Sequence, residues 1–366
     1  MNHARAALFR EVGKIEIDEV PVRNPLIGEV LIRMVRASVC GSDVHIWKGE
    51  IDLTALGVDM PIILGHEGYG FVEALGAGIN TDVLGQRLHE GDVVTFRYFS
   101  SCGNCKGCNA GRVEYCPHSR DFLGRRQNGM PLLSGTFADY FLLDANPWVV
   151  KVPEWVDHRI LPSLNCAVAQ VVYAVRCAEA QPNMSAVVFG VGGLGMWATM
   201  YLRDMGVTTV AVDPDSGRGE LAKRCGADAV VSLPTNEAVW ESLRALGATD
   251  GADLVFDFVG IPDVLTSGLR LLAPGGRVVE VGGVTPGTAS VAPSQLVFGN
   301  HRIVGVELYD KDALVESVRF CGSLDNRYPI DELFGKTWDL TETEAALQAS
   351  ASRHAFRPII TVSDKA

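Results

Sequence analysis

Four cysteines lie within one short segment, residues 101–117, in the spacing Cys-x₂-Cys-x₂-Cys-x₇-Cys. Four thiolates from one loop suit a tetrahedral zinc ion and leave it no open position for a substrate. An iron–sulfur cluster also takes four thiolates, but nothing else in the sequence indicates an electron-transfer partner. We therefore predict a structural zinc ion in this segment. Its ligands would be Cys102, Cys105, Cys108 and Cys116.

A glycine-rich turn follows a short apolar segment, residues 185–189. Its G-x-G-x-x-G spacing permits a tight turn, a close approach of the backbone to a pyrophosphate, and close packing of a helix on a strand. The helix expected next would direct its N-terminus at the anion. Such a turn can also be purely structural, so the prediction needs support elsewhere. The residues of the turn are Gly190, Gly192, Gly193, Leu194 and Gly195.

Asp213 supplies that support, because it ends the next apolar segment, 208–212, and lies 18 residues beyond Gly195. A carboxylate at this place accepts hydrogen bonds from the adenosine ribose hydroxyls. It would repel the 2′-phosphate of NADP, so the sequence favours NAD. Arg218 follows nearby and is able to bind either the ribose or a phosphate.

Three further metal-ligand candidates, Cys40, His66 and Cys166, are dispersed along the chain. A lone cysteine is most often a small buried residue, so spacing alone does not join these three into a site.

Length and charge limit the classes of function. The chain has 366 residues, enough for about two domains, and a net charge of −12. This acidic balance makes nucleic acid and anionic membranes poor partners, which leaves a small molecule as the expected partner. The first 17 residues mix charged and apolar types, unlike a secretory signal, so we expect a cytoplasmic protein. The chain has nine cysteines. An odd number of cysteines in the reducing cytoplasm does not suggest a disulfide framework.

The secondary structure expected around these residues differs between two parts of the chain. Short, turn-rich strands occupy about the first 150 residues and predict a mostly β domain. From residue 185, apolar strands alternate with helical stretches, which predicts parallel βαβ units in an open, doubly wound sheet. We expect a catalytic domain at 1–166, a dinucleotide-binding domain at 167–303, and a return to the catalytic domain at 304–366.

Taken in order, these motifs resemble those of the zinc-dependent medium-chain alcohol dehydrogenases. The resemblance rests on Cys40-Gly-Ser-Asp43, Gly65-His-Glu-Gly68, the four-cysteine segment and the glycine turn, and it covers nearly the whole chain. It implies an α/β protein in which a mostly β, GroES-like catalytic domain accompanies a Rossmann domain. It also implies a homodimer or homotetramer.

The resemblance further implies a catalytic zinc ion held by Cys40, His66 and Cys166, with Asp43 and Glu67 orienting these ligands or approaching the metal. Three protein ligands would leave one open position for an alcohol oxygen.

Other residues match the family's proton path and cofactor site. Ser42 would lie beside the substrate oxygen, and His45 would carry the proton to water. Arg357 would reach the pyrophosphate, and the backbone at Gly282 and Val284 would meet the nicotinamide carboxamide.

The substrate is indicated less directly. The segment 40–47 resembles sorbitol and threonine dehydrogenases, whereas Asn165-Cys166-Ala167 is similar to dehydrogenases of bulky secondary alcohols, such as hydroxycamphor, and to those associated with phosphonate catabolism. We favour a bulky, apolar secondary alcohol and its ketone. The alternatives are L-threonine, a polyol, or a hydroxyalkylphosphonate bound by Arg97, Arg125 or Arg126. The expected pocket residues are Trp47, Tyr98, Gln170 and Leu308.

The same residues argue against two other functions. A zinc-free enone or quinone reductase would lack Cys40, His66 and the four-cysteine segment, all of which are present. A non-catalytic nucleotide-binding protein would have no need of the zinc ligands, Ser42 and His45.

Overall fold

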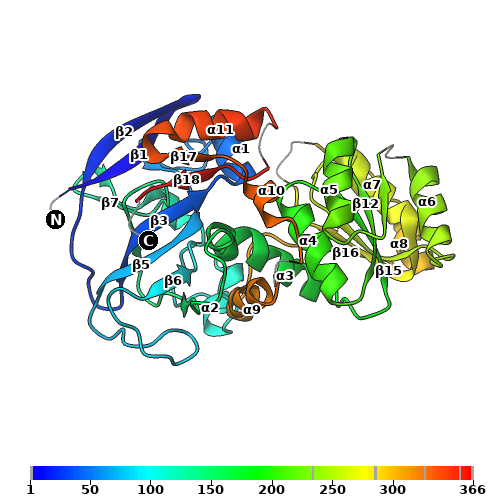
Figure 1. The fold of residues 1–366 in the computed structure, drawn as a ribbon, viewed down its shortest axis with the longest axis horizontal. Coiled ribbons are helices and arrows are strands. Elements are labelled where there is room, and N and C mark those ends of the chain that lie inside the picture. Colours follow the sequence, from blue (N-terminus) through cyan, green and yellow to red (C-terminus); the bar gives the residue numbers. More distant parts are fainter. Residues whose placement is uncertain (1–2, 233–234, 284–286, 325–326, 354–355, 364–366) are drawn as a thin grey trace. The chain divides into compact units, whose positions relative to one another are not determined.

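The computed structural model describes residues 3–232, 235–283, 287–324, 327–353 and 356–363. Contacts within the chain divide it into two compact units (Figure 1). Unit 1 comprises residues 1–167, 310–323 and 330–366, and unit 2 comprises residues 168–309 and 324–329. The domain boundaries expected from the sequence stay a prediction.

Unit 1 is built mainly of β-strands. Its largest sheet has seven strands in the order β10-β6-β5-β3-β18-β17, with β9 also paired to β3, and a second sheet has the order β2-β1-β4. The strands are β1 (His3–Glu11), β2 (Lys14–Pro21), β3 (Val30–Ser38), β4 (Ile62–Ile63), β5 (Glu67–Leu75), β6 (Val93–Phe96), β7 (Arg126–Gln127), β8 (Met130–Pro131), β9 (Tyr140–Leu143), β10 (Val149–Lys151), β17 (Thr337–Asp339) and β18 (Ile359–Thr361).

Strand β3 lies at the centre of unit 1 because its apolar side chains are buried on both faces. It pairs with β5 on one side and with β18 on the other, and Ser38 at its end lies opposite both Glu67 and Ile359. A residue shortly before β18 is therefore brought near the start of β5, although almost 300 residues separate them in sequence.

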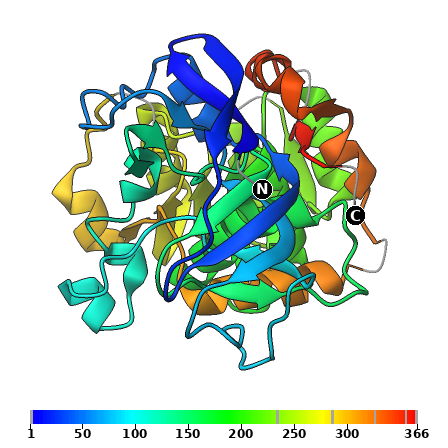
Figure 2. The ribbon, with the colours of Figure 1, turned by 90° about the vertical axis from the view of Figure 1, so that its left-hand side faces the viewer.

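Short helices complete unit 1. Figure 2 looks onto this unit and shows the N-terminal ribbon β1–β2 (blue) near α11 (red). The backbone N–H of Ile15 in β2 donates to Glu344 of α11, which joins the two ends of the chain (3.0 Å). The helices are α1 (Gly41–Trp47), α2 (Lys106–Asn109), α9 (Lys311–Gly322), α10 (Ile330–Phe334) and α11 (Thr343–Ala351), and a π-helical turn, Leu164–Val168, leads out of the unit.

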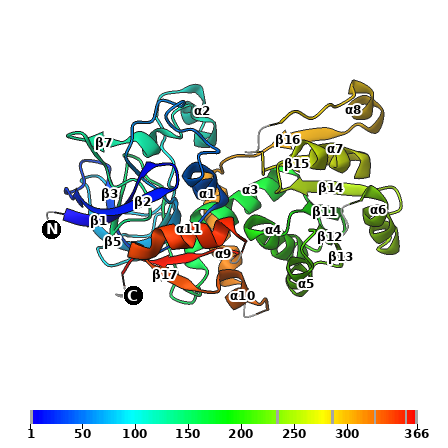
Figure 3. The same cartoon turned by 90° about the horizontal axis from the view of Figure 1, so that it is seen from above.

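Unit 2 contains a six-stranded parallel sheet in the order β13-β12-β11-β14-β15-β16. Helices cover both of its faces (Figure 3). The elements are α3 (Ala169–Cys177), β11 (Ser185–Phe189), α4 (Gly193–Asp204), β12 (Thr208–Val212), α5 (Ser216–Arg224), β13 (Ala229–Val231), α6 (Asn236–Ala245), β14 (Ala252–Asp257), α7 (Pro262–Leu271), β15 (Leu272–Glu280), α8 (Pro293–Gly299) and β16 (Arg302–Gly305).

The strand order explains why this sheet presents one edge to a ligand. Strand β11 is central, and the chain leaves it first toward β12 and later toward β14, so the order reverses beside it. Ligands of doubly wound sheets bind at the carboxyl ends of the strands at such a point. The structure thus confirms the predicted fold class. Among the described residues, no helix has both the length and the apolar character needed to cross a membrane.

Candidate active site

A cluster of potential metal ligands lies inside unit 1. One ligand atom from each of Cys40, His66, Glu67 and Cys166 lies within 4.8 Å of the others, and all four residues are buried. Cys40 immediately precedes α1, His66 immediately precedes β5, and Cys166 lies in the π-helical turn. Two sulfur atoms and one imidazole nitrogen are the donors that zinc prefers, so the residues present fit a zinc ion. The structure brings together all three expected ligands.

Asp43 ties two of these ligands together from outside the cluster. Its side chain accepts backbone hydrogen bonds from Cys40 (2.9 Å) and Gly65 (3.3 Å), and it lies 3.3 Å from Nδ1 of His66. Because Nδ1 faces this carboxylate, Nε2 is the nitrogen that would bind a zinc ion. The predicted orienting role of Asp43 is consistent with these contacts.

The two thiols of the cluster are electrostatically different. A hydrogen bond from Cys166, together with the nearby His66 ring, holds the pKa of Cys40 well below its usual range. The same hydrogen bond and burial raise the pKa of Cys166. Burial alone would lower the pKa of His66, but Asp43 and Cys40 outweigh it and raise that pKa. The cluster thus already stabilises one thiolate, which is the form that binds metals.

Glu67 is held by two residues that lie far from it in sequence. Nη2 of Arg357 donates to both of its carboxylate oxygens, and the hydroxyl of Ser38 donates to one of them. All three side chains are buried. Burial raises the pKa of Glu67 to about 7, against the opposing effect of Arg357. Arg357, which we expected at the pyrophosphate, is thus found bound to Glu67, and contact with a pyrophosphate stays a prediction.

The glycine turn joins β11 to α4 in unit 2, as the sequence predicts. Gly190 has a positive φ of 81°, which favours glycine. A Cβ added at Gly195 would lie 2.0 Å from the carbonyl oxygen of Gly190, so no larger residue fits between turn and helix. The turn therefore leaves the N-terminus of α4 open to a ligand at the carboxyl end of β11.

Asp213 lies directly after β12 and next to this turn. It is 5% exposed, and its Oδ2 accepts the backbone N–H of Val191 (3.0 Å) while its Oδ1 accepts that of Asp215 (3.0 Å). Arg218, in the first turn of α5, approaches the glycine turn closely enough that a Cβ on Gly192 would lie 3.7 Å from its Nη1. Two of the expected cofactor residues therefore flank the glycine turn.

Comparison with known proteins identifies the family. The alcohol dehydrogenase GroES-like domain matches residues 27–154, and the zinc-binding dehydrogenase domain matches residues 193–323. A 5-exo-hydroxycamphor dehydrogenase of Pseudomonas putida is 30% identical over 98% of this chain and 99% of its own length. The chain belongs to the zinc-dependent medium-chain alcohol dehydrogenases.

Two further similarities lie within the same family. An L-threonine 3-dehydrogenase of Pyrococcus abyssi is 31% identical over 77% of this chain and 76% of its own length. The crystal structure of an alcohol dehydrogenase from Thermotoga maritima superposes with a TM-score of 0.89 at 26% identity, covering 98% of this chain and 99% of that one. An oxidoreductase acting on alcohols is therefore the function that the family gives.

Asn165 has a structural role that the sequence motifs did not predict. It is fully buried, its Nδ2 donates to the carbonyl oxygen of His66 (2.9 Å), and its Oδ1 accepts the backbone N–H of Gly68 (2.9 Å). These two hydrogen bonds thus connect the segment that carries Cys166 to the start of β5. Its position beside Cys166 was visible in the sequence, but its two backbone partners follow only from the fold.

The expected proton-path residues share helix α1. Ser42 and His45 are half-buried and three positions apart, so they lie on one side of the helix. Nδ1 of His45 is hydrogen-bonded to the carboxylate of Glu50. This contact leaves Nε2 of His45 available to another partner.

The residues expected around the substrate divide between the two units. In unit 1, the ring of Tyr98 lies 4.7 Å from that of His66 and packs edge-on against Phe99 and Phe122, and Trp47 is half-buried against the apolar core. In unit 2, Gln170 is half-buried and Leu308 is buried. Tyr98 is thus an aromatic neighbour of the metal cluster.

The three arginines proposed for a phosphonate are occupied elsewhere. Arg97 is buried, with its guanidinium 4.7 Å from the ring centre of Trp148. Arg125 donates to the carbonyl oxygen of Leu142 (2.8 Å), and Arg126 donates to that of Pro61 (2.9 Å). These contacts stabilise unit 1 and argue against an anion site made by the three side chains.

The second metal-ligand cluster is the four-cysteine segment. The sulfur atoms of Cys102, Cys105, Cys108 and Cys116 lie within 4.8 Å of one another. Backbone N–H groups point at two of them, from Cys108 to Cys105 (3.4 Å) and from Cys102 to Cys116 (3.3 Å). Backbone hydrogen bonds also lower the pKa of Cys102 to about 6. Four converging sulfur atoms with N–H donors around them fit a structural zinc ion.

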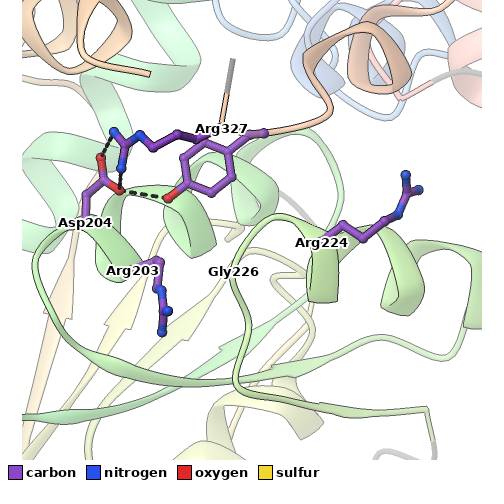
Figure 4. A pocket seen from close by; sticks show the side chains of 6 residues that line it. Arg203, Asp204, Arg224, Gly226 and Arg327 are labelled. Carbon is purple, nitrogen blue, oxygen red and sulfur yellow. Dashed lines mark hydrogen bonds and ion pairs between the residues drawn. The ribbon is translucent and has the colours of Figure 1, made fainter. Parts of the chain in front are cut away.

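Unit 2 also contains the segment expected at the nicotinamide and a surface hollow. Gly282 follows β15 and is half-buried, whereas Val284 lies outside the described residues. A surface hollow of about 590 Å³ is found beside Asp204, at the carboxyl end of α4 and therefore away from the glycine turn. Its Arg327 and Tyr328 both bind Asp204 (2.8 and 2.7 Å; Figure 4), so these three side chains already satisfy one another.

Proposed function

We propose that this dehydrogenase oxidises a secondary, largely apolar alcohol to a ketone, reversibly, with zinc and NAD. The observation that carries the proposal is the buried cluster of Cys40, His66 and Cys166. Three protein ligands of this kind leave one zinc position for substrate, whereas four cysteines close the second site. We therefore propose one catalytic and one structural zinc ion per chain.

The chemistry divides between the bound groups and the chain. Zinc, when bound, stabilises the negative charge that develops on the alcohol oxygen, and NAD accepts the hydride. Asp43 fixes the orientation of His66, and the Glu67–Arg357 pair leaves no uncompensated charge beside the ligands. The thiolate form of Cys40 is favoured by its neighbours before any metal binds.

The alcohol proton needs a path to water. We propose that Ser42 accepts it from the substrate hydroxyl while passing its own proton onward, and that Nε2 of His45 receives it. Glu50 supports this role because its bond to Nδ1 orients the ring and balances the charge of a protonated imidazole.

The nucleotide is proposed to bind at the glycine turn. The N-terminus of α4 would face the pyrophosphate, and Asp213 would bind the adenosine ribose. A buried carboxylate at this place disfavours a 2′-phosphate, which supports NAD over NADP.

The apolar substrate is supported by the surroundings of the metal cluster. Tyr98 lies against His66, and Phe122 packs behind it, whereas Arg97 is occupied by structural contacts. The similar 5-exo-hydroxycamphor dehydrogenase acts on a bulky secondary alcohol. The alternative is a polar alcohol such as L-threonine or a polyol, which the similarity to an L-threonine 3-dehydrogenase supports.

The test is NADH formation by zinc-replete protein with bicyclic secondary alcohols, hydroxyalkylphosphonates, L-threonine, polyols and simple primary alcohols. We expect the highest kcat/KM with the bicyclic alcohols. A preference for L-threonine or polyols would establish the alternative. The absence of turnover with every alcohol, despite bound zinc and NADH, would contradict the enzymatic proposal.

We also propose that the chain forms a homodimer or homotetramer through unit 2. Strand β16 is an edge of the described sheet, and Phe298 in the preceding helix α8 is 86% exposed, beside the exposed Val297. Two neighbouring exposed apolar side chains close in sequence to an open sheet edge suit pairing with a second copy. Light scattering should show an oligomer that Phe298→Glu weakens, and a monomeric wild type would refute this.

A further inference from the structure

Two carboxyl groups lie side by side at the ligand-facing edge of unit 2. Asp257 ends β14 and Glu280 ends β15, and the parallel register places them opposite each other. Asp257 is fully buried and Glu280 is half-buried. Because paired residues of neighbouring strands project to the same face, the two side chains are direct neighbours.

Two buried oxygen atoms of this carboxyl pair have no hydrogen-bond donor in the described part of the chain. Oδ1 of Asp257 accepts the backbone N–H groups of Val259 (2.7 Å) and Gly260 (2.9 Å). Its Oδ2 and the Oε1 of Glu280 are buried, and among the described residues no N–H or hydroxyl group donates to either. Two carboxylates can only accept hydrogen bonds, so a proton on one of the two carboxyl groups would supply the missing donor.

The electrostatic surroundings favour that proton. Burial and the neighbouring Asp257 carboxylate raise the pKa of Glu280 to about 8, and burial raises the pKa of Asp257. Two like charges this close in a partly desolvated place cannot both be ionised near neutral pH without a large cost. The sheet neighbours on either side, Phe189 and Gly305, carry no charge.

The charged groups of the surrounding elements are exposed or paired with other residues. Asp263, in the first turn of α7, is exposed, as is Glu307 beyond β16, while helix α8 carries no titratable residue. Arg277 lies three residues before Glu280 in β15, about 10 Å away, and is paired with Glu179 (2.5 Å). Arg302 of β16 is bound to the same Glu179.

Asp257 also connects the two backbone segments that follow the strands. Its carbonyl oxygen accepts the N–H groups of Val281 and Gly282 (3.0 Å each), while its carboxylate holds Val259 and Gly260. The segments are in direct contact, since a Cβ on Gly260 would lie 1.8 Å from the carbonyl oxygen of Gly282. Asp257 thus holds both segments, one through its carboxylate and the other through its carbonyl oxygen.

We propose that Asp257 and Glu280 share a single proton, and that this proton fixes the backbone around Gly260 and Gly282 in the position required to bind the nicotinamide end of the cofactor. Both are positioning residues. The assignment rests on the proposed function for the identity of the ligand, whereas the shared proton itself does not depend on it.

The direction of the pH dependence follows from the raised pKa. Glu280 holds its proton more tightly in the folded chain than in the unfolded chain, so its contribution to stability is complete at low pH. That contribution is lost as the pH rises through about 8. If cofactor binding requires the shared proton, about 3% of molecules are competent at pH 9.5, and the Kd rises by up to about 30-fold.

The experiment measures the Kd of NADH by fluorescence, and the thermal midpoint, of zinc-replete protein at about pH 6.5 and about pH 9.5. In Glu280→Gln, the amide donates a permanent hydrogen bond to Asp257. We expect this variant to bind NADH as tightly as wild type at the lower pH and to lose most of the wild-type weakening at the higher pH. Asp263→Asn, which removes an exposed acid of the same sheet edge, should behave as wild type.

The thermal midpoint distinguishes a failure of the proposed function from a failure of the shared-proton proposal. If NADH binds at neither pH, the proposed function fails, but a smaller drop of the midpoint in Glu280→Gln than in wild type still supports the shared proton. Equal pH dependence of both Kd and midpoint in the two proteins would overturn it. Asp257→Asn provides a second variant if Glu280→Gln does not fold, and it should remove the same pH dependence.

Discussion

Arg357 donates from one nitrogen to both carboxylate oxygens of Glu67, a residue 290 positions earlier in the chain, and both side chains are buried. Glu67 directly follows the metal-ligand candidate His66, and Arg357 precedes the strand that pairs with β3. The last strand of unit 1 is thereby coupled to its metal cluster. A buried ion pair of this kind is costly to break, because either partner alone is an uncompensated buried charge.

Loss of Arg357 should therefore destabilise the protein strongly. We expect Arg357→Met to lower the free energy of unfolding by about 3–5 kcal/mol, measured by denaturant titration of zinc-replete protein. The double variant Arg357→Met/Glu67→Gln should recover part of this loss, since no charge then remains unpaired. Arg319→Met removes an exposed arginine of α9 and serves as the control. A loss no greater than that of the control would show that the pair does not stabilise the fold.

The two cysteine clusters should have separable effects. Cys105→Ala should reduce the zinc content from two ions per chain to one and lower the thermal midpoint, because the metal organises residues 101–117. Cys166→Ala should also remove one zinc ion, but it should abolish turnover while the structural site persists. Cys177→Ala, outside both clusters, is the control. Metal analysis and NADH formation check the prediction, and full activity of Cys166→Ala would disprove the ligand assignment.

The parts of this site that the sequence predicted are those with local causes. Gly190 and Gly195 are separated by one turn, and their conformational and steric demands hold in any strand-to-helix turn of this type. The four-cysteine cluster is equally local, since its spacing alone brings the sulfur atoms together. For the same reason, alternating strands and helices sufficed to predict the doubly wound sheet.

The remaining parts depend on tertiary pairing. No spacing rule joins Cys40, His66 and Cys166, and only the family resemblance united them before the fold was known. The family resemblance placed Arg357 at a pyrophosphate, and its bond to Glu67 was missed because the sequence does not show that β18 pairs with β3. The acid pair of Asp257 and Glu280 was missed likewise, since it depends on the register between β14 and β15.

Asn165 should control how tightly the metal is held. In Asn165→Leu, the carbonyl of His66 and the N–H of Gly68 become buried without partners, each at a cost of about 1–3 kcal/mol. We expect zinc affinity at this site to fall by about 10–100-fold, as for other residues that orient metal ligands. Asn165→Asp retains the acceptor for Gly68 but loses the donor to His66, so its loss should be intermediate.

Competition with a chromophoric chelator measures this affinity, and the zinc ion of the four-cysteine cluster provides an internal control. The affinity of the four-cysteine cluster for zinc should be unchanged in both Asn165 variants, because that cluster lies in a separate segment. If both metal sites of Asn165→Leu bind zinc with the wild-type affinity, the amide has no role in holding the metal site.

Asp213 should determine the choice between the two nicotinamide cofactors. In Asp213→Gly the carboxylate that would bind the ribose and repel a 2′-phosphate is gone, while Arg218 remains beside the turn. The ratio of kcat/KM for NAD to that for NADP should therefore fall, by about tenfold or more. Part of the loss with NAD will come from the turn itself, since Oδ2 of Asp213 also holds the N–H of Val191.

Asp213→Asn separates these two effects. Its side-chain oxygen keeps an acceptor for Val191 but removes the negative charge, so it should improve use of NADP with less damage to the turn. Both variants are compared with Asp263→Asn, an exposed acid elsewhere in unit 2. An unchanged NAD-to-NADP ratio in both would remove Asp213 from the cofactor site and leave Arg218 as the residue to test.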